Sequence, residues 1–166
     1  VMLGRLINEV LRQSLSRFPW GDTLSVFKTA DIRICNLECV IADTETPWTE
    51  TPKAFHFRSD SKNAAVLKAA GIDCVSLANN HTLDFGYEAL LNMITSLDRA
   101  GIQHAGAGPD LKSASQPAII TCNGIRIGCV AFTDNEPAWE ATPTRPGVFY
   151  MPVEPHDARL QTLLDV

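Results

Sequence analysis

Hydrophobic residues recur every three or four positions in three stretches of the chain, and this spacing predicts three helices. The first must end before Pro19, because proline cannot continue a helix. Gly71 and Gly101 follow the other two at the point where a left-handed residue commonly ends a helix. The predicted helices cover residues 6–15, 60–70 (with Asp60 or Ser61 as the cap) and 87–100.

Four shorter runs, rich in β-branched or alternating apolar residues, predict strands. Asn36 and Glu38 interrupt the first of these runs with polar side chains. The alternation of strands with helices is typical of an α/β fold with a parallel sheet and right-handed crossovers. The predicted strands cover residues 32–41, 54–58, 73–78 and 102–105.

The last third of the chain has a different pattern. Residues 119–132 contain Asn123-Gly124 between two β-rich runs, which predicts an antiparallel hairpin with a type I′ turn. Residues 133–155 are rich in proline and predict loops, and 158–166 have helical spacing. Because this helical pattern and the opening strand pattern at Val1 are both cut short, we expect a single domain, 1–166, that is truncated at both ends.

Composition places the chain in the ordinary soluble globular class, with 166 residues, 45% of them hydrophobic. The net charge of −5 and the absence of Lys/Arg blocks argue against nucleic acid as a partner. No apolar stretch approaches the roughly 20 residues of a membrane span. The five cysteines are odd in number and lack CxxC spacing, so we expect reduced thiols.

Polar side chains gather where two neighbouring predicted strands end. In open α/β sheets ligands bind beyond the carboxyl ends of the strands, where loops converge. Carboxylate, amide and imidazole groups from two strand ends would make a plausible shell for a divalent metal ion. The residues concerned are Asn36 and Glu38 at the first end, and Asn79, Asn80, His81 and Asp84 at the second.

A purely structural interpretation competes with this hypothesis. Asn79 and Asn80 suit a turn, and Asp84 could simply cap the helix at Tyr87. Glu38 is harder to explain structurally, because an acidic side chain inside an apolar strand is costly to bury without a partner. Arg5 could bind an anion or form a surface salt bridge.

Four segments together resemble the poly-γ-glutamate capsule synthesis protein family (CapA-like), whose fold resembles the calcineurin-like metallophosphoesterases. The segments are VMLGR at 1–5, NLE at 36–38, LKAAGIDCVSLANNHTLDFG at 67–86 and AGIQHAGAGPDLKSASQPAII at 100–120. The resemblance implies a metallophosphoesterase-like four-layer α/β sandwich, of which residues 1–166 form the N-terminal part. It implies a role in poly-γ-glutamate or capsule biosynthesis, either as a metal-dependent hydrolase or as a non-catalytic polyglutamate-binding or assembly component.

The same resemblance implies roles for individual residues around two divalent metal ions of the Mn, Fe or Zn type. Glu38 and Asn80 would be metal ligands, and His81 would act near the leaving group, with Asp84 as its partner. The family's first metal-binding Asp and its later histidine-rich motifs are absent from this sequence. An anionic substrate or poly-γ-glutamate would be the partner, in an assembly attached to a membrane through regions outside this chain. The candidate substrate-binding residues are Arg5, Asn36 and Asn79.

Overall fold

The computed structural model describes residues 1–154, 158 and 159, and it shows a mixed α/β fold built on a small parallel sheet. Cys35, Val75 and His104 lie in register on its three strands. This arrangement confirms the parallel sheet, while the four-layer sandwich stays a prediction. The strand order is β1 (Ile34–Asn36), β4 (Cys74–Ser76), β5 (Gln103–Ala105).

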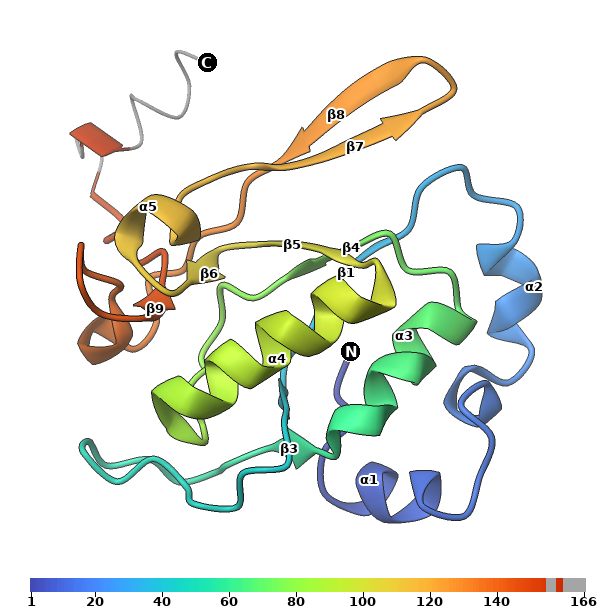
Figure 1. Ribbon diagram of the computed structural model, residues 1–166, viewed down its shortest axis with the longest axis horizontal. Helices are drawn as coiled ribbons and strands as arrows, with labels where there is room; N and C mark the ends of the chain where they lie inside the picture. The colour runs from blue at the N-terminus through green and yellow to red at the C-terminus, as the bar shows by residue number, and fades with distance from the viewer. Residues whose placement is uncertain (155–157, 160–166) are drawn as a thin grey trace.

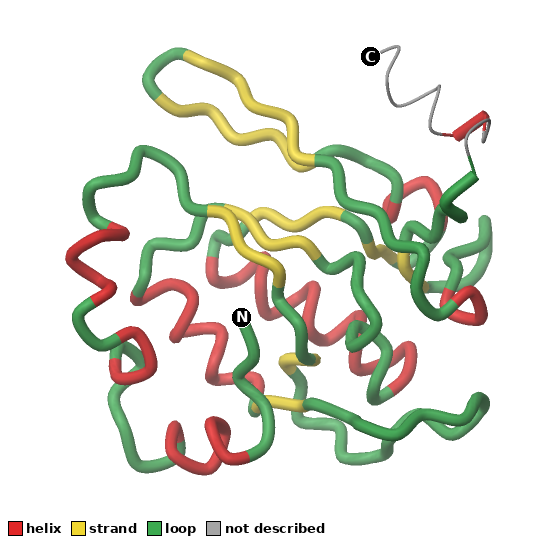
Figure 2. Tube along the Cα trace, turned by 180° about the vertical axis from the view of Figure 1, so that it is seen from behind, coloured by secondary structure: helices red, strands yellow, loops and turns green. Residues whose placement is uncertain are grey.

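Helices α3 (Ala64–Ala69) and α4 (Gly86–Ala100) connect these strands and lie on the same side of the sheet in both views (Figures 1 and 2). A short 3-10 turn, η2 (Ser61–Asn63), precedes α3. Gly71 and Gly101 have φ values of 69° and 72°, as the sequence predicts for the ends of these helices. The main core lies between the sheet and the helices and includes Leu67, Val75, Leu90, Met93 and Leu97.

The first predicted helix, 6–15, is shorter than expected. Helix α1 (Leu6–Leu11) ends four residues early, and Leu15 is 66% exposed, so the apolar spacing beyond Leu11 does not correspond to burial. Two further short elements follow, η1 (Phe18–Trp20) and α2 (Thr23–Phe27).

The predicted strand 32–41 is divided into two. The Leu37 amide still bonds to the Ser76 carbonyl (3.0 Å), but the Val40 amide bonds to the Phe57 carbonyl (3.0 Å) instead. The chain thus changes sheets, because strand β2 (Val40–Ile41) pairs in parallel with β3 (Arg58–Ser59). Glu38 therefore lies in the connection between two strands and is half-buried, contrary to the prediction that it interrupts one continuous strand. The predicted strand 54–58 overlaps β3 only at its last residue.

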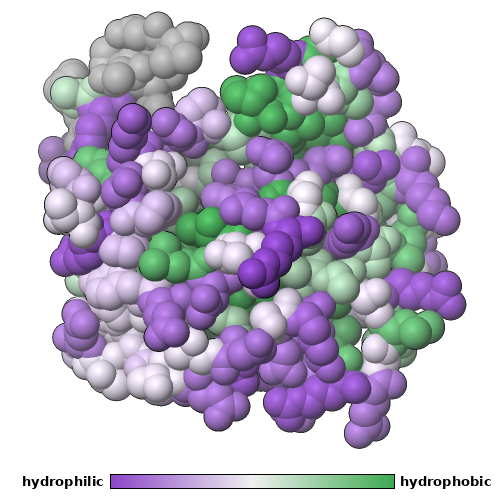
Figure 3. Space-filling view, viewed as in Figure 1, coloured by the Kyte–Doolittle hydropathy of each residue, from purple (hydrophilic) through white to green (hydrophobic). Residues whose placement is uncertain are grey.

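On the other side of the sheet, the predicted hairpin is confirmed as β7 (Ala118–Cys122) and β8 (Ile125–Cys129). Asn123 and Gly124 both have positive φ, 50° and 78°, as a type I′ turn requires. The exposed apolar side chains of this hairpin include Ile119 and Ile125. Figure 3 shows apolar surface in this part of the molecule. The remaining elements are β6 (Ala107–Gly108), α5 (Leu111–Ala114), η3 (Pro137–Trp139) and β9 (Gly147–Val148).

All five cysteines are free, as expected. Burial raises the pKa of the Cys39 thiol to about 11, so this side chain is protonated at neutral pH. Among the described residues, no helix is long and apolar enough to cross a membrane. Of the predicted helical stretch 158–166, only Ala158 and Arg159 lie within the described residues, and both are helical.

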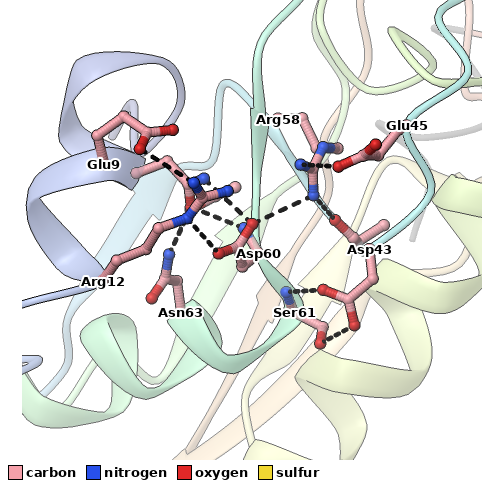
Figure 4. A network of polar contacts seen from close by, with 11 residues as sticks. Glu9, Arg12, Asp43, Glu45, Arg58, Asp60, Ser61 and Asn63 are labelled. Atoms are coloured by element: carbon pink, nitrogen blue, oxygen red, sulfur yellow. Dashed lines mark hydrogen bonds and ion pairs between the residues drawn. The ribbon is translucent and has the colours of Figure 1, made fainter.

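A network of polar contacts joins α1 to the start of η2 (Figure 4). Asp60 accepts from Arg12 and Arg58 at 3.3 Å each. Asp43 accepts from the Ser61 hydroxyl (2.6 Å) and amide (2.9 Å), and these bonds hold the pKa of Asp43 below its ordinary value. Burial raises the pKa of Asp60, but hydrogen bonds from Asn8 and Arg12 outweigh it and leave that pKa lowered as well.

Both carboxyl groups make the free energy of unfolding depend on acid pH. Because their pKa values are lower in the folded chain, they add stability above the ordinary carboxyl value of 3.8, and this stability is lost as the pH falls through the folded values. We expect urea unfolding to show a steady loss of stability as the pH falls below about 5 and through the lowered pKa values of the two groups. Asp43→Asn should reduce this slope, whereas the exposed control Asp22→Asn should not; equal slopes in both variants would contradict the assignment.

Candidate functional site

Asn79 links the ends of β1 and β4. Its Nδ2 donates to the Asn36 side-chain oxygen and to the Leu37 carbonyl, both at 2.9 Å, and its Oδ1 accepts from the His81 amide at 2.9 Å. Asn36 in turn donates to the Glu38 carboxylate across a long 3.5 Å contact. The groups predicted at the two strand ends are therefore joined in one chain of contacts that runs from Glu38 to His81.

His81 and Asp84 form a buried pair. His81 Nδ1 lies 2.7 Å from Asp84 Oδ2, and the two residues are 8% and 0% exposed. The same carboxylate oxygen accepts from the Phe57 amide at 2.7 Å. Because a carboxylate can only accept, the bond places the imidazole proton on Nδ1 and leaves the lone pair on Nε2 when the ring is neutral.

Asn80 lies beside this pair, with its Nδ2 3.3 Å from His81 Nε2, a contact that fits a donor facing the Nε2 lone pair. Asp84 does not cap the following helix, because the N-cap of α4 is Phe85 and no side chain bonds there. Of the two interpretations of Asp84 in the sequence, the structure therefore supports the contact with His81.

Lys53 completes the surroundings of Asp84 and was missed by sequence reasoning. Its side chain is 6% exposed, and its Nζ lies 3.5 Å from Asp84 Oδ1, 3.2 Å from Glu136 Oε1 and 2.5 Å from the Asn80 carbonyl. Nζ also lies 4.8 Å from the centroid of the Trp139 ring. Its partners lie 27 and 83 residues away in sequence, so no local signal could have identified it.

Arg5 lies at the edge of the same region and is exposed. Its guanidinium carbon is 4.5 Å from the centroid of the Phe57 ring, and that ring meets the His81 ring edge-on at 4.7 Å. The structure thus brings Arg5, Asn36, Glu38, Asn79, Asn80, His81 and Asp84 into one neighbourhood.

The donors in this neighbourhood suit a divalent metal ion in part. The Glu38 carboxylate and the Asn80 side-chain oxygen are ligand types that Mn, Fe and Zn accept. Within the part of the chain that the structure describes, however, no group of three or more His, Cys, Asp or Glu side chains is arranged to hold a metal. The side chains are of a suitable chemical kind, and the metal site itself stays a prediction.

Residues 1–164 match the family described as bacterial capsule synthesis protein PGA_cap, and the chain belongs to this family, as its motifs predicted. A probable polyglutamine synthesis accessory protein of Mycobacterium tuberculosis (strain CDC 1551 / Oshkosh) is 36% identical over 140 residues, covering 80% of this chain and 36% of that protein. The capsule biosynthesis protein CapA of Bacillus anthracis is 26% identical over 153 residues, covering 91% of this chain and 37% of CapA.

The PGA biosynthesis protein CapA of Bacillus subtilis (strain 168) is 24% identical over 157 residues, covering 93% of this chain and 40% of that protein. The chain thus spans between 36% and 40% of the length of these three relatives.

The buried position of Lys53 gives a test of the site's architecture. Lys53→Met would leave the Asp84 and Glu136 charges without their cation, and breaking a buried pair in this way costs roughly 3 kcal/mol of unfolding free energy. Urea unfolding should show this loss, while the exposed control Lys68→Met should change stability by less than about 0.5 kcal/mol. A Lys53→Met variant as stable as the control would show that the buried cation is not needed.

Proposed function

We propose that the chain belongs to a protein that acts on poly-γ-glutamate during capsule biosynthesis, with the ends of β1 and β4 as the reactive site. The observation that carries the proposal is the buried His81–Asp84 pair, connected through Asn79 to Asn36 and Glu38. The printed names of the relatives, which refer to capsule, PGA and polyglutamine synthesis, support the substrate class.

The proposed chemistry is hydrolysis or transfer, in which the attacking water or the leaving group takes the place of Asn80 Nδ2 at His81 Nε2 and exchanges a proton there. Asp84 holds Nδ1–H and stabilises the positive charge that the ring gains when Nε2 takes a proton. Lys53 contacts the other Asp84 oxygen, so the carboxylate is held from two sides. Asn79 keeps the backbone of His81 at a fixed distance from β1.

Glu38 and Asn80 would hold a divalent metal ion in this scheme, in a protein with two such ions. A bound metal ion of this kind lowers the pKa of a coordinated water and stabilises developing negative charge. The long, half-exposed contact between Asn36 and Glu38 leaves the Glu38 carboxylate with room for a further partner. Asn36 would then orient this carboxylate, as hydrogen-bonded neighbours of metal ligands commonly do.

A second candidate function is polyglutamate binding or assembly without catalysis. The exposed Arg5 guanidinium next to the ring that contacts His81 favours it, because a cation there could hold an anionic polymer without any turnover. Membrane association of such an assembly would come from regions outside this chain.

Two measurements on the full-length protein separate the candidates. Glu38→Gln should lower the metal content found by elemental analysis, and His81→Ala should lower the rate of poly-γ-glutamate hydrolysis by about 10²- to 10⁴-fold, the usual contribution of a general acid or base. The matched controls Glu50→Gln, an exposed loop carboxylate, and His104→Ala, a half-buried histidine paired with Asp98 at 3.3 Å, should change neither quantity.

Removing metal ions with a chelator distinguishes the metal-dependent enzyme from the binding function. Loss of hydrolysis on treatment with EDTA, and its return on adding Mn²⁺ or Zn²⁺, would support the metal-dependent enzyme. Polymer binding that persists after chelation and in both variants, in a folded protein without hydrolysis, would overturn the catalytic proposal and support the binding function.

A further inference from the structure

The backbone at Arg5 has a conformation that side chains rarely adopt. Its φ of 51° and ψ of −125° fall in a region that glycine favours, and Asn123 and Glu136 are the other non-glycine residues with positive φ in the described part of the chain. Such conformations persist where the surroundings enforce them, and they cluster at functional sites. Although Gly4 precedes it directly, the positive φ occurs at Arg5, a residue that carries a side chain.

Contacts with the segment before β3 hold this turn in place. A Cβ atom added at Gly4 would lie 3.1 Å from the Arg58 amide and 3.1 Å from the Phe57 Cβ, so the two segments are tightly packed. A larger residue at position 4 would therefore push these neighbours away by a few tenths of an ångström, and Arg5 lies in the turn that follows. The turn aims the Arg5 side chain across the same segment.

The guanidinium rests on two aromatic rings. It lies 4.5 Å from the centroid of Phe57 and 5.1 Å from that of Phe55, and these two rings are 6.5 Å apart. The cation thus lies over two neighbouring rings, and its N–H groups remain able to donate to a planar oxyanion. No carboxylate among the described residues forms an ion pair with Arg5, which differs in this from Arg12, Arg33 and Arg58.

The position of this cluster connects it to the candidate site. Phe57 contacts Arg5 through one part of its ring and meets the His81 ring edge-on, with an interplanar angle of 81°. Phe55 is 57% exposed and offers an apolar surface beside the charge. A ligand held by Arg5 would therefore meet the Phe57 ring, which itself contacts the imidazole, and would have the exposed Phe55 ring beside its methylene groups.

We propose that Arg5, Phe55 and Phe57 form a carboxylate-binding site, in which the Arg5 guanidinium takes one free carboxylate of a γ-linked glutamate chain and the two rings contact its methylene groups. The proposal rests on the proposed function for the identity of the polymer, and on the contacts of Arg5 for the site itself. The strained turn supplies the orientation: Arg5 is held in place before the ligand arrives, which reduces the conformational cost of binding.

The test compares three variants of the full chain by isothermal titration with a γ-linked glutamate oligomer. Arg5→Gly removes the charge and relieves the backbone, and we expect Kd to rise about tenfold or more, as for loss of a charged hydrogen bond. Arg5→Lys keeps the charge but loses the planar fork, so a smaller rise is expected. The matched control Asn123→Gly relaxes another positive-φ position and should leave Kd unchanged.

Thermal unfolding separates binding from folding in these variants. Relief of the turn should keep the Tm of Arg5→Gly within about 4 °C of the wild type, so that weaker binding cannot come from unfolding. Wild-type affinity in a folded Arg5→Gly variant would overturn the proposal. If Arg5→Gly proves unstable, wild-type affinity in Arg5→Lys together with unchanged Arg5 side-chain NMR signals on adding oligomer would overturn it equally.

A small dicarboxylate tests carboxylate binding at Arg5 without the polymer. Glutarate should shift the NMR signal of the Arg5 Nε–H group, and inorganic phosphate should do so only at higher concentration. A shift with glutarate but no binding of the oligomer would support the site and count against poly-γ-glutamate as the ligand. No shift with either glutarate or the oligomer would overturn the site, and equal affinity for phosphate would overturn its assignment to carboxylates.

Discussion

The buried side chain of Asn79 makes a set of hydrogen bonds on which the candidate site depends. Its amide satisfies the Leu37 carbonyl and the Asn36 side chain on one strand end, and its oxygen satisfies the His81 backbone on the other. Unpaired polar groups in a buried place cost about 1–3 kcal/mol each, so the two strand ends are held in one relative position. Asn36, Glu38 and His81 are brought together by this link.

A buried charge cluster fixes the loops around the pair. Lys53 comes from the loop before β3, Asp84 from the loop before α4, and Glu136 from the loop before η3. Trp48 and Trp139 are both buried and meet edge-on, with ring centroids 5.7 Å apart. Three loops that share no local sequence pattern thus meet at a single cation and a pair of aromatic rings. The His81–Asp84 pair is thus held between loops that lie far apart in the sequence.

Sequence patterns predicted most of the elements in which buried residues recur at a regular spacing. Helix α4 and the hairpin β7–β8 match their predictions closely, since one has a continuous apolar face and the other carries Asn-Gly at a turn that requires two positive φ values. The same patterns gave a wrong prediction where the chain leaves one sheet and pairs with a strand of another. The pattern of residues 32–41 predicts one apolar strand. Within it, however, the hydrogen-bonding partner changes from Ser76 to Phe57, and Glu38 lies in the connection between the two resulting strands.

The sequence by itself determined the parallel α/β core, the family, and the polar residues that end β1 and β4, because these depend on local spacing and on contiguous motifs. Only the tertiary structure decided that Asp84 binds His81 in preference to capping α4, that Lys53 is buried between Asp84 and Glu136, and that Arg5 stacks on Phe55 and Phe57. These contacts join residues up to 83 positions apart. No periodicity encodes such pairs, since their energy arises from burial and charge in the folded chain.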